Sequence, residues 1–215
     1  ALPYSMIVDD QGRRFANEAE SYVDLGHKML EHEGNGDFWF ITETRHASRY
    51  FRTYALDPRA NKARDAEGIR FKADTLAELG GALGLDLEVF RETVQRFNGF
   101  ARTGRDQDFN RGDSVYDRYY GDPTVRPNAC LGPLEKGPFM ALKIVAGDLG
   151  TKGGIVTDEY ARALRDDGTV IEGLFSAGNN SASVMGRTYP GPGSSIAPAV
   201  VFGMIAARYM LRNRI

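Results

Sequence analysis

The sequence predicts a mixed α+β fold, in which strand-like and helix-like segments follow one another without a regular repeat. Three observations lead to this prediction. Short apolar or β-branched runs at residues 5–8, 38–42 and 139–145 are typical of buried strands. Apolar residues recur at helical spacing between residues 17 and 33 and again between residues 76 and 100. The chain has 215 residues, 42% of them hydrophobic, which is enough to build the core of one large or two small domains.

The first hundred residues carry ordinary strand and helix signals. Residues 5–15 are predicted to form a strand, a turn at Gly12 and a return strand. A helix is predicted over residues 17–33, ended by the run Gly34-Asn35-Gly36, and the strand 38–42 follows it. Two further helices are predicted after residues that favour helix N-termini, which are Asp74 or Thr75 for the first helix and Asp86 for the second.

Residues 104–138 lack this periodicity and are rich in Arg, Asp, Tyr, Gly and Pro. A loop of this length inside a compact domain is either functional or a linker, and its Tyr and Arg content favours packing. Because the ligand order of an EF-hand is absent, its aspartates and arginines predict internal salt bridges rather than a calcium site. Cys130 is interpreted as a small packing residue of this loop.

The last third of the chain is predicted to contain short strands and a terminal helix. Strands are expected at residues 139–145 and 155–157, and a turn at residues 165–168 joins two strand-like runs. A strand over residues 174–177 leads into Gly178. Ser194 or Ser195 is expected to open a helix that extends to residue 212.

Charge and cysteine content exclude several classes of function. The chain has 27 basic and 29 acidic side chains and a net charge of −2, so nothing indicates a surface for nucleic acid or an anionic membrane. One cysteine cannot form an internal disulfide, and three histidines without a second cysteine argue against a structural zinc site. The sequence therefore predicts no metal. It also shows no signal segment, and we expect a soluble, cytoplasmic protein.

The Gly-rich turn before the terminal helix is the strongest candidate for a functional site. Gly191 and Gly193 let a ligand approach the backbone closely. The helix that follows presents free N–H groups and the positive end of its dipole, so this turn could hold an anion or a developing negative charge. A Gly-rich turn that only caps a core helix accounts for the same residues equally well.

Two tyrosines stand out for their surroundings. Tyr189 lies between Thr188 and a Pro-Gly-Pro-Gly run, where a rigidly held hydroxyl could donate to a carbonyl oxygen. Tyr22 lies near the start of a predicted helix. For each of them, an ordinary packing role is the alternative.

Several motifs together resemble the carboxy-terminal part of the 3-ketosteroid Δ1-dehydrogenases, which belong to the fumarate reductase and succinate dehydrogenase flavoprotein superfamily. The motifs are residues 148–158 (DLGTKGGIVTD), 173–179 (GLFSAGN) and 183–193 (SVMGRTYPGPG). Residues 7–18 (IVDDQGRRFANE) resemble the start of the catalytic, or capping, domain of that superfamily. The stretch Met-Gly-Arg-Thr-Tyr-Pro-Gly at residues 185–191 is the most specific of these motifs.

The resemblance also implies that the chain is one piece of a longer enzyme. Family members hold the ADP part of FAD with a strand, a G-x-G-x-x-G turn and a helix, and this Rossmann part is absent from these residues. Residues 1–147 are expected to form the catalytic domain, and residues 148–215 the final segment of the FAD-binding domain. The remainder of that domain would then be a partner, and FAD would bind poorly to this piece alone.

The resemblance assigns roles to individual residues. It implies that the Tyr189 hydroxyl and the Gly193 backbone N–H hold the C3 oxygen of a steroid, as an oxyanion hole does. Tyr22 matches, less closely, the tyrosine that takes a proton from C2, assisted by a tyrosine from the absent part, while a hydride leaves C1 for the flavin. The flavin would be lined by Gly178 and Asn179 and approached by the helix N-terminus at Ser194, Ser195 and Ile196.

One comparison within the superfamily indicates the substrate. In fumarate reductases and succinate dehydrogenases, which belong to the superfamily that this chain resembles, the corresponding turn reads Arg-x-Gly-Gly. The arginine of that turn binds a carboxylate of the substrate. Tyr189 stands at about that place here, and Arg187 is two residues away, so a neutral ketone such as a 3-ketosteroid is expected rather than a dicarboxylate. The alternatives are a 3-ketosteroid Δ4-(5α)-dehydrogenase, a fumarate reductase-like flavoprotein, and a catalytically inert capping or interaction module. The electron acceptor cannot be read from the sequence.

Overall fold

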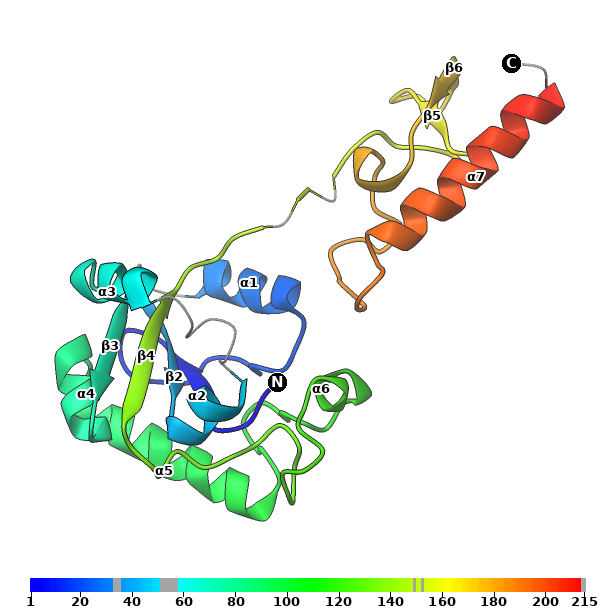
Figure 1. Ribbon diagram of the computed structural model, residues 1–215. Helices are drawn as coiled ribbons and strands as arrows, with labels where there is room; N and C mark the ends of the chain where they lie inside the picture. The colour runs from blue at the N-terminus through cyan, green and yellow to red at the C-terminus, as the bar shows by residue number, and fades with distance from the viewer. Residues whose placement is uncertain (33–35, 51–57, 149, 152, 214–215) are drawn as a thin grey trace. The chain divides into compact units, whose positions relative to one another are not determined.

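The structure is a computed structural model that describes residues 1–32, 36–50, 58–148, 150–151 and 153–213 (Figure 1). The chain divides into two compact units. The first contains residues 1–20 and 25–146, and the second contains residues 21–24 and 147–215.

The first unit is built on a four-stranded antiparallel sheet with the strand order β1-β2-β4-β3. Its strands are β1 (Ser5–Val8), β2 (Phe38–Thr42), β3 (Arg70–Ala73) and β4 (Phe139–Ile144). Met6 pairs with Ile41, which in turn pairs with Ala141, and all three are fully buried. They pack with α4 (Leu76–Leu83) and α5 (Leu87–Thr103) into the core of the unit.

Side chains begin the helices of this unit. Thr75 caps α4 in a reciprocal capping box with Glu78, and the Asp86 carboxylate accepts hydrogen bonds from the first turn of α5. Both predicted caps are confirmed. Helix α1 (Tyr22–Glu31) begins five residues later than predicted, because the Ser21 hydroxyl accepts from the Asp24 N–H at 3.1 Å and so defines the first turn. Of the predicted stop signal, Gly34 and Asn35 lie outside the described residues.

The return strand predicted after Gly12 is wrong, since β1 pairs with β2 instead. Hydrogen bonds to side chains replace a strand ladder there. The Asp9 carboxylate accepts from the N–H groups of Gln11 and Arg13, and Arg14 turns inward to Glu18 at 2.8 Å. The sequence also did not predict β3 or three short helices, which are α2 (Thr44–Tyr50), α3 (Pro58–Ala66) and α6 (Val115–Tyr119).

The long segment 104–138 packs onto the first unit through buried polar groups. The predicted salt bridges exist, but their partners lie mostly outside the segment. Asp106 pairs with Arg14 at 2.8 Å and Arg111 pairs with Glu18 at 3.0 Å. Cys130 is fully buried and its thiol is free, in agreement with a packing role. In the part of the chain that the structure describes, no group of three His, Cys, Asp or Glu side chains is arranged to hold a metal ion.

The second unit combines a hairpin with the terminal helix. Strands β5 (Arg162–Leu164) and β6 (Val170–Phe175) are joined by the predicted turn, in which the Gly168 N–H donates to the Arg165 carbonyl at 2.9 Å. A 3-10 helix, η1 (Gly178–Asn180), and α7 (Ile196–Asn213) follow. The strand predicted at residues 155–157 is reduced to isolated bridges, one from Ile155 to Ser181 and one from Thr157 to Ala163.

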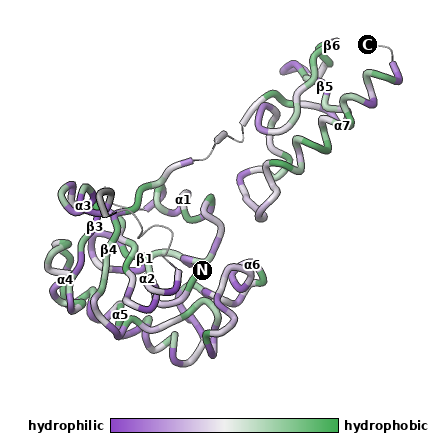
Figure 2. Tube along the Cα trace, viewed as in Figure 1, coloured by the Kyte–Doolittle hydropathy of each residue, from purple (hydrophilic) through white to green (hydrophobic). Residues whose placement is uncertain are grey.

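The described part of the second unit buries little apolar surface of its own. Its buried apolar residues are all alanines, namely Ala161, Ala163 and Ala206. Figure 2 shows hydrophobic residues along much of α7, and five of the large ones are exposed, namely Ile196, Val200, Val201, Met204 and Leu211. No helix among the described residues is long and apolar enough to cross a membrane.

Candidate active site

The predicted cofactor site lies where η1 meets the first turns of α7. Gly178 begins η1 with a φ of +67°, and a Cβ atom on it would lie 2.8 Å from the Cβ atom of Ala199 in α7. Any larger residue would therefore be strained in its backbone and would push α7 away. The glycine permits the close approach of η1 to α7.

A small cavity of about 20 Å³ opens between these elements, which is room for a single water-sized group. Four of the predicted cofactor residues line it, which are Gly178, Asn179, Ser194 and Ser195. Ile196, the remaining one, is the first residue of α7 and is 71% exposed. The structure thus brings the predicted cofactor residues to one place, although fourteen residues of sequence lie between Asn179 and Ser194.

The N-terminus of α7 carries positive potential with nothing to neutralise it nearby in sequence. The first turn holds no acidic residue, and within the described residues no acceptor faces the N–H groups of Gly193, Ser195 and Ile196. Free N–H groups and the helix dipole both favour an electron-rich group at this point.

The turn that carries Tyr189 is held by its own hydrogen bonds. The Thr188 N–H and hydroxyl both donate to the Met185 carbonyl, at 3.3 and 3.0 Å. The Ser194 N–H donates to the Gly191 carbonyl at 3.2 Å, as does the Ser194 hydroxyl. These bonds flank Tyr189 on both sides, so its half-buried ring is supported by a structured turn.

Tyr22 and Tyr189 lie in ring contact within the second unit. Their ring centroids are 4.7 Å apart and the ring planes are tilted by 49°, a favourable geometry for an aromatic pair. Tyr22 remains 47% exposed, so part of this residue is open to a ligand. The two tyrosines that the family resemblance selects are separated by 166 intervening residues in sequence, and the structure brings them together.

Gly193 completes the predicted set of donors. It has a φ of +98°, a conformation that favours glycine, and its N–H is one of those left without an acceptor. A Tyr hydroxyl and a backbone N–H on one turn are both uncharged donors, and such a pair stabilises negative charge that develops on a carbonyl oxygen. Arg187, which could clamp a carboxylate, is exposed and lies two residues before Tyr189.

Sequence reasoning missed a close backbone contact against η1. Gly154 runs so close to η1 that a Cβ atom on it would lie 2.4 Å from the Asn180 carbonyl oxygen, and the Ile155 N–H donates to that oxygen at 3.0 Å. The glycine run at residues 150–154 was the available signal, because clustered glycines mark places where two backbones approach each other.

Comparison with known proteins yields a family and close relatives. Residues 3–196 match the FAD binding domain family. The chain is 50% identical over 214 residues to a 3-oxosteroid 1-dehydrogenase of Mycolicibacterium smegmatis, covering 95% of this chain and 38% of that protein. It is 48% identical over 217 residues to a protein of the same name from Mycobacterium tuberculosis, covering 97% of this chain and 38% of that protein.

Among solved structures, a 3-ketosteroid Δ1-dehydrogenase from Sterolibacterium denitrificans, in complex with 1,4-androstadiene-3,17-dione, matches with a TM-score of 0.88 and 36% identity. The match covers 99% of this chain and 39% of that one. The predicted fold, of the fumarate reductase flavoprotein type, is thereby confirmed. This chain spans little more than a third of the length of the proteins it matches.

Proposed function

The chain belongs to the FAD binding domain family, and from this premise we propose that it is the catalytic portion of an FAD-dependent 3-ketosteroid dehydrogenase. The proposed reaction introduces a double bond between C1 and C2 of ring A. Relatives named 3-oxosteroid 1-dehydrogenase, and the fold of a Δ1-dehydrogenase that binds a steroid dienone, support this assignment.

The ring contact between Tyr22 and Tyr189 is the observation that carries the proposal. Desaturation next to a ketone needs a donor on the oxygen and a base at the adjacent carbon, only a few ångströms apart. Neighbouring tyrosines on separate segments meet that requirement. Tyr22 is also 47% exposed, so part of this residue is open to a substrate.

The residues around the cavity fit FAD. The free N–H groups at the start of α7 suit the electron-rich edge of a flavin ring, where negative charge grows on reduction. Gly178 and Asn179, which line the cavity, would line the ring beyond the end of β6. When bound, FAD supplies the acceptor for the hydride.

The substrate would be held and activated by three groups of this chain. The Tyr189 hydroxyl and the Gly193 N–H donate to the C3 oxygen and stabilise the negative charge that forms there. Tyr22 accepts the proton from C2, and the C2–H electron pair forms the enolate. As the C3 oxygen returns to a carbonyl, that pair forms the C1–C2 double bond and the hydride leaves C1. The substrate loses one proton and one hydride, so it is oxidised by two electrons.

A neutral ketone suits this site better than a dicarboxylate. Uncharged donors bind a carbonyl oxygen without a counter-charge, whereas a substrate carboxylate calls for a bidentate arginine. We therefore place 3-ketosteroids ahead of fumarate. A Δ4-(5α)-dehydrogenase would use the same donors with different ring carbons, and its product distinguishes it.

The second unit is proposed to be the closing segment of an FAD-binding domain, with the boundary between residues 147 and 148. Its apolar core consists of alanines, too little to stabilise about 70 residues alone. Large apolar residues instead form an exposed stripe along α7. The stripe consists of Ile196, Val200, Met204 and Leu211. We propose that the remainder of the same domain covers this stripe. An inert capping module would not need the N-terminus of α7 to be open. A cytoplasmic location stays a prediction of the sequence.

The full-length flavoprotein tests this proposal with an artificial electron acceptor. A saturated-ring-A or 4-ene 3-ketosteroid should be turned over to the C1–C2 unsaturated product, and fumarate should not be reduced. Turnover of fumarate alone, or a product unsaturated only at C4–C5, would overturn the assignment.

The variant Tyr189→Phe should lower steroid turnover by roughly 10²-fold, the effect of losing one oxyanion donor. Tyr119→Phe is the matched control, because that tyrosine is 74% exposed on α6 and should keep full activity. Normal turnover by Tyr189→Phe would remove this residue from the reaction.

A further inference from the structure

We propose that the segment 104–119, here called the clamp, positions Tyr22 for proton abstraction by fixing the backbone of residues 14–20 that leads into α1. This inference rests on the function proposed above. It gives the long non-periodic segment, which the sequence marked as either functional or a linker, a defined task in the reaction.

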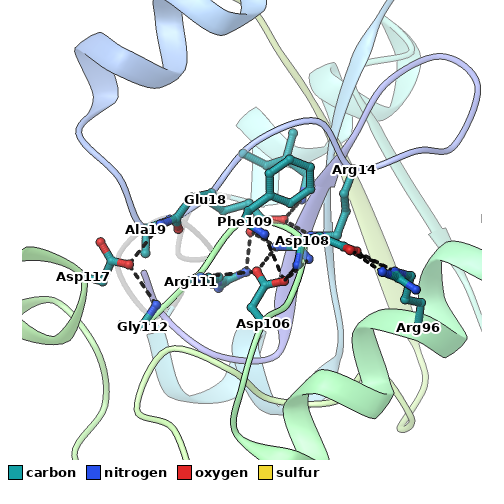
Figure 3. Close-up of polar contacts among 12 residues, drawn as sticks. Arg14, Glu18, Ala19, Arg96, Asp106, Asp108, Phe109, Arg111, Gly112 and Asp117 are labelled. Atoms are coloured by element: carbon teal, nitrogen blue, oxygen red, sulfur yellow. Dashed lines mark hydrogen bonds and ion pairs between the residues drawn. The ribbon is translucent and has the colours of Figure 1, made fainter. Parts of the chain in front are cut away.

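The first anchor of the clamp is a buried cluster of four charges (Figure 3). Arg14 donates to Glu18 and to Asp106, each at 2.8 Å. Arg111 donates to the Glu18 carboxylate at 3.0 Å and to the Ser5 carbonyl at 2.8 Å. The side chains of this cluster are at most 4% exposed. Two residues of the clamp thus bind both ends of the stretch from Arg14 to Glu18.

The second anchor lies closer to Tyr22. The Asn17 amide donates to the Asp117 carboxylate at 3.0 Å, and the Asn17 carbonyl side-chain oxygen accepts from the Ala19 N–H at 2.8 Å. Asp117 is itself held in place, because its carboxylate accepts from the Gly112 N–H at 2.8 Å and from the Ser114 hydroxyl at 2.6 Å. The Asn17 side chain therefore links Asp117 to the backbone just ahead of α1 by hydrogen bonds.

Residues 14–20 need such anchors because they form neither helix nor strand. Without a ladder of backbone hydrogen bonds, side-chain bonds set the position of this segment. The Ser21 hydroxyl then accepts from the Asp24 N–H and begins α1 at Tyr22.

The chemistry of the first anchor also favours positioning over stability. Replacing buried ion pairs by apolar side chains of similar volume often leaves a protein equally stable or more stable. What directional charge-assisted hydrogen bonds add is a fixed geometry. Geometry matters at this point, since a misplacement of about 1 Å can cost about 10²-fold in rate.

The test uses the full-length flavoprotein and a substitution at the second anchor. Asn17→Asp keeps the bond to the Ala19 N–H but places a second carboxylate against that of Asp117. We expect Asn17→Asp to lower kcat at least about tenfold, with KM and FAD content within about twofold of wild type. Asp113→Asn, an exposed carboxylate of the clamp, is the matched control and should leave kcat unchanged.

A deuterium isotope effect separates positioning from general damage. With the substrate deuterated at C2, the effect on kcat should rise in Asn17→Asp, since proton removal by Tyr22 becomes slower. With deuterium at C1 it should not rise. A loss of kcat without this change in the isotope effect, or no loss of kcat, overturns the proposal.

If Asn17→Asp does not fold, Asn17→Ser replaces it, because a serine can still accept from the Ala19 N–H while losing the bridge to Asp117. The same kcat loss and isotope effect are then required. Absence of steroid turnover in the wild-type protein would instead refute the proposed function, so the two failures are distinguishable.

Discussion

Replacing Glu18 by glutamine should remove a large part of the acid sensitivity of the first unit. The Glu18 side chain is 2% exposed and is bonded by both Arg14 and Arg111. Burial alone would raise the pKa of this carboxyl, but the charges and hydrogen bonds of the two arginines override that effect and lower the pKa from 4.5 to about 2. The folded state therefore holds the ionised form far more strongly than the unfolded state does.

The size and sign of the effect follow from proton linkage. A pKa lowered by about 2.5 corresponds to about 3 kcal/mol of folding free energy. Between pH 4.5 and 2 the unfolded chain binds this proton and the folded chain does not, so unfolding is favoured as the pH falls. The contribution is fully present above the unfolded pKa and is lost as the pH falls through the folded pKa.

The assay is urea unfolding of wild type and Glu18→Gln across pH 7 to 2. At pH 7 the variant should be less stable by about 3–5 kcal/mol, because Arg111 and Arg14 lose a buried counter-charge. The difference should shrink by about 3 kcal/mol as the pH reaches 2. Glu92→Gln, an exposed carboxyl on α5, is the control and should follow the wild-type curve. Parallel curves for wild type and Glu18→Gln would refute the reasoning.

Two further predictions concern individual positions. Gly178→Ala should weaken FAD retention by the full-length protein, because the new Cβ would lie 2.8 Å from that of Ala199 at a φ of +67°. The measure is the FAD released on dialysis. Gly168→Ala controls for backbone strain alone, since its Cβ would meet nothing within 4 Å at a φ of +81°, and equal FAD loss from both variants would contradict the packing argument. Burial raises the pKa of the Cys130 thiol, so a disulfide reagent should label the native protein slowly and the urea-unfolded protein fast; rapid labelling of the native protein would show that this thiol is accessible.

The parts of the fold that local chemistry determines could be predicted from the sequence. The caps at Thr75 and Asp86 were found because a side chain and the N–H groups it accepts from are only two or three residues apart. The strand 38–42 was found because its aromatic and β-branched residues are typical of a buried strand. Elements of mixed polarity were not predicted. One of them is β3, in which Arg70 and Lys72 interrupt the apolar pattern expected of a buried strand.

The failed return strand after Gly12 has a different cause. The run Arg13-Arg14-Phe15 follows a turn and was therefore predicted to be a strand. The Arg14 side chain instead bonds Asp106, which lies 92 residues further along the chain. A partner at that separation cannot be inferred from one sequence. For the same reason, family motifs selected Tyr22 and Tyr189, whereas their ring contact had to come from the structure. Motifs name the candidate residues, and long-range contacts decide which of them can act together.

The two units differ in what they bury, and this bears on how the site is assembled. The first unit buries large side chains, among them Phe90, Phe97 and Leu131, and anchors its long segment with buried charges. The second buries only alanines among its apolar residues in the described part, and exposes the stripe from Ile196 to Leu211. An exposed stripe of this kind favours association with another apolar surface. Burying it would hold α7 in place, and the N–H groups of its first turn, together with Gly193 on the turn before it, would then be fixed. Under the proposed function, completing the FAD-binding domain therefore adds to the hydrogen bonds that already hold the turn with the oxyanion donors, whereas the backbone ahead of Ser21 is held within the first unit by Asn17 and Asp117.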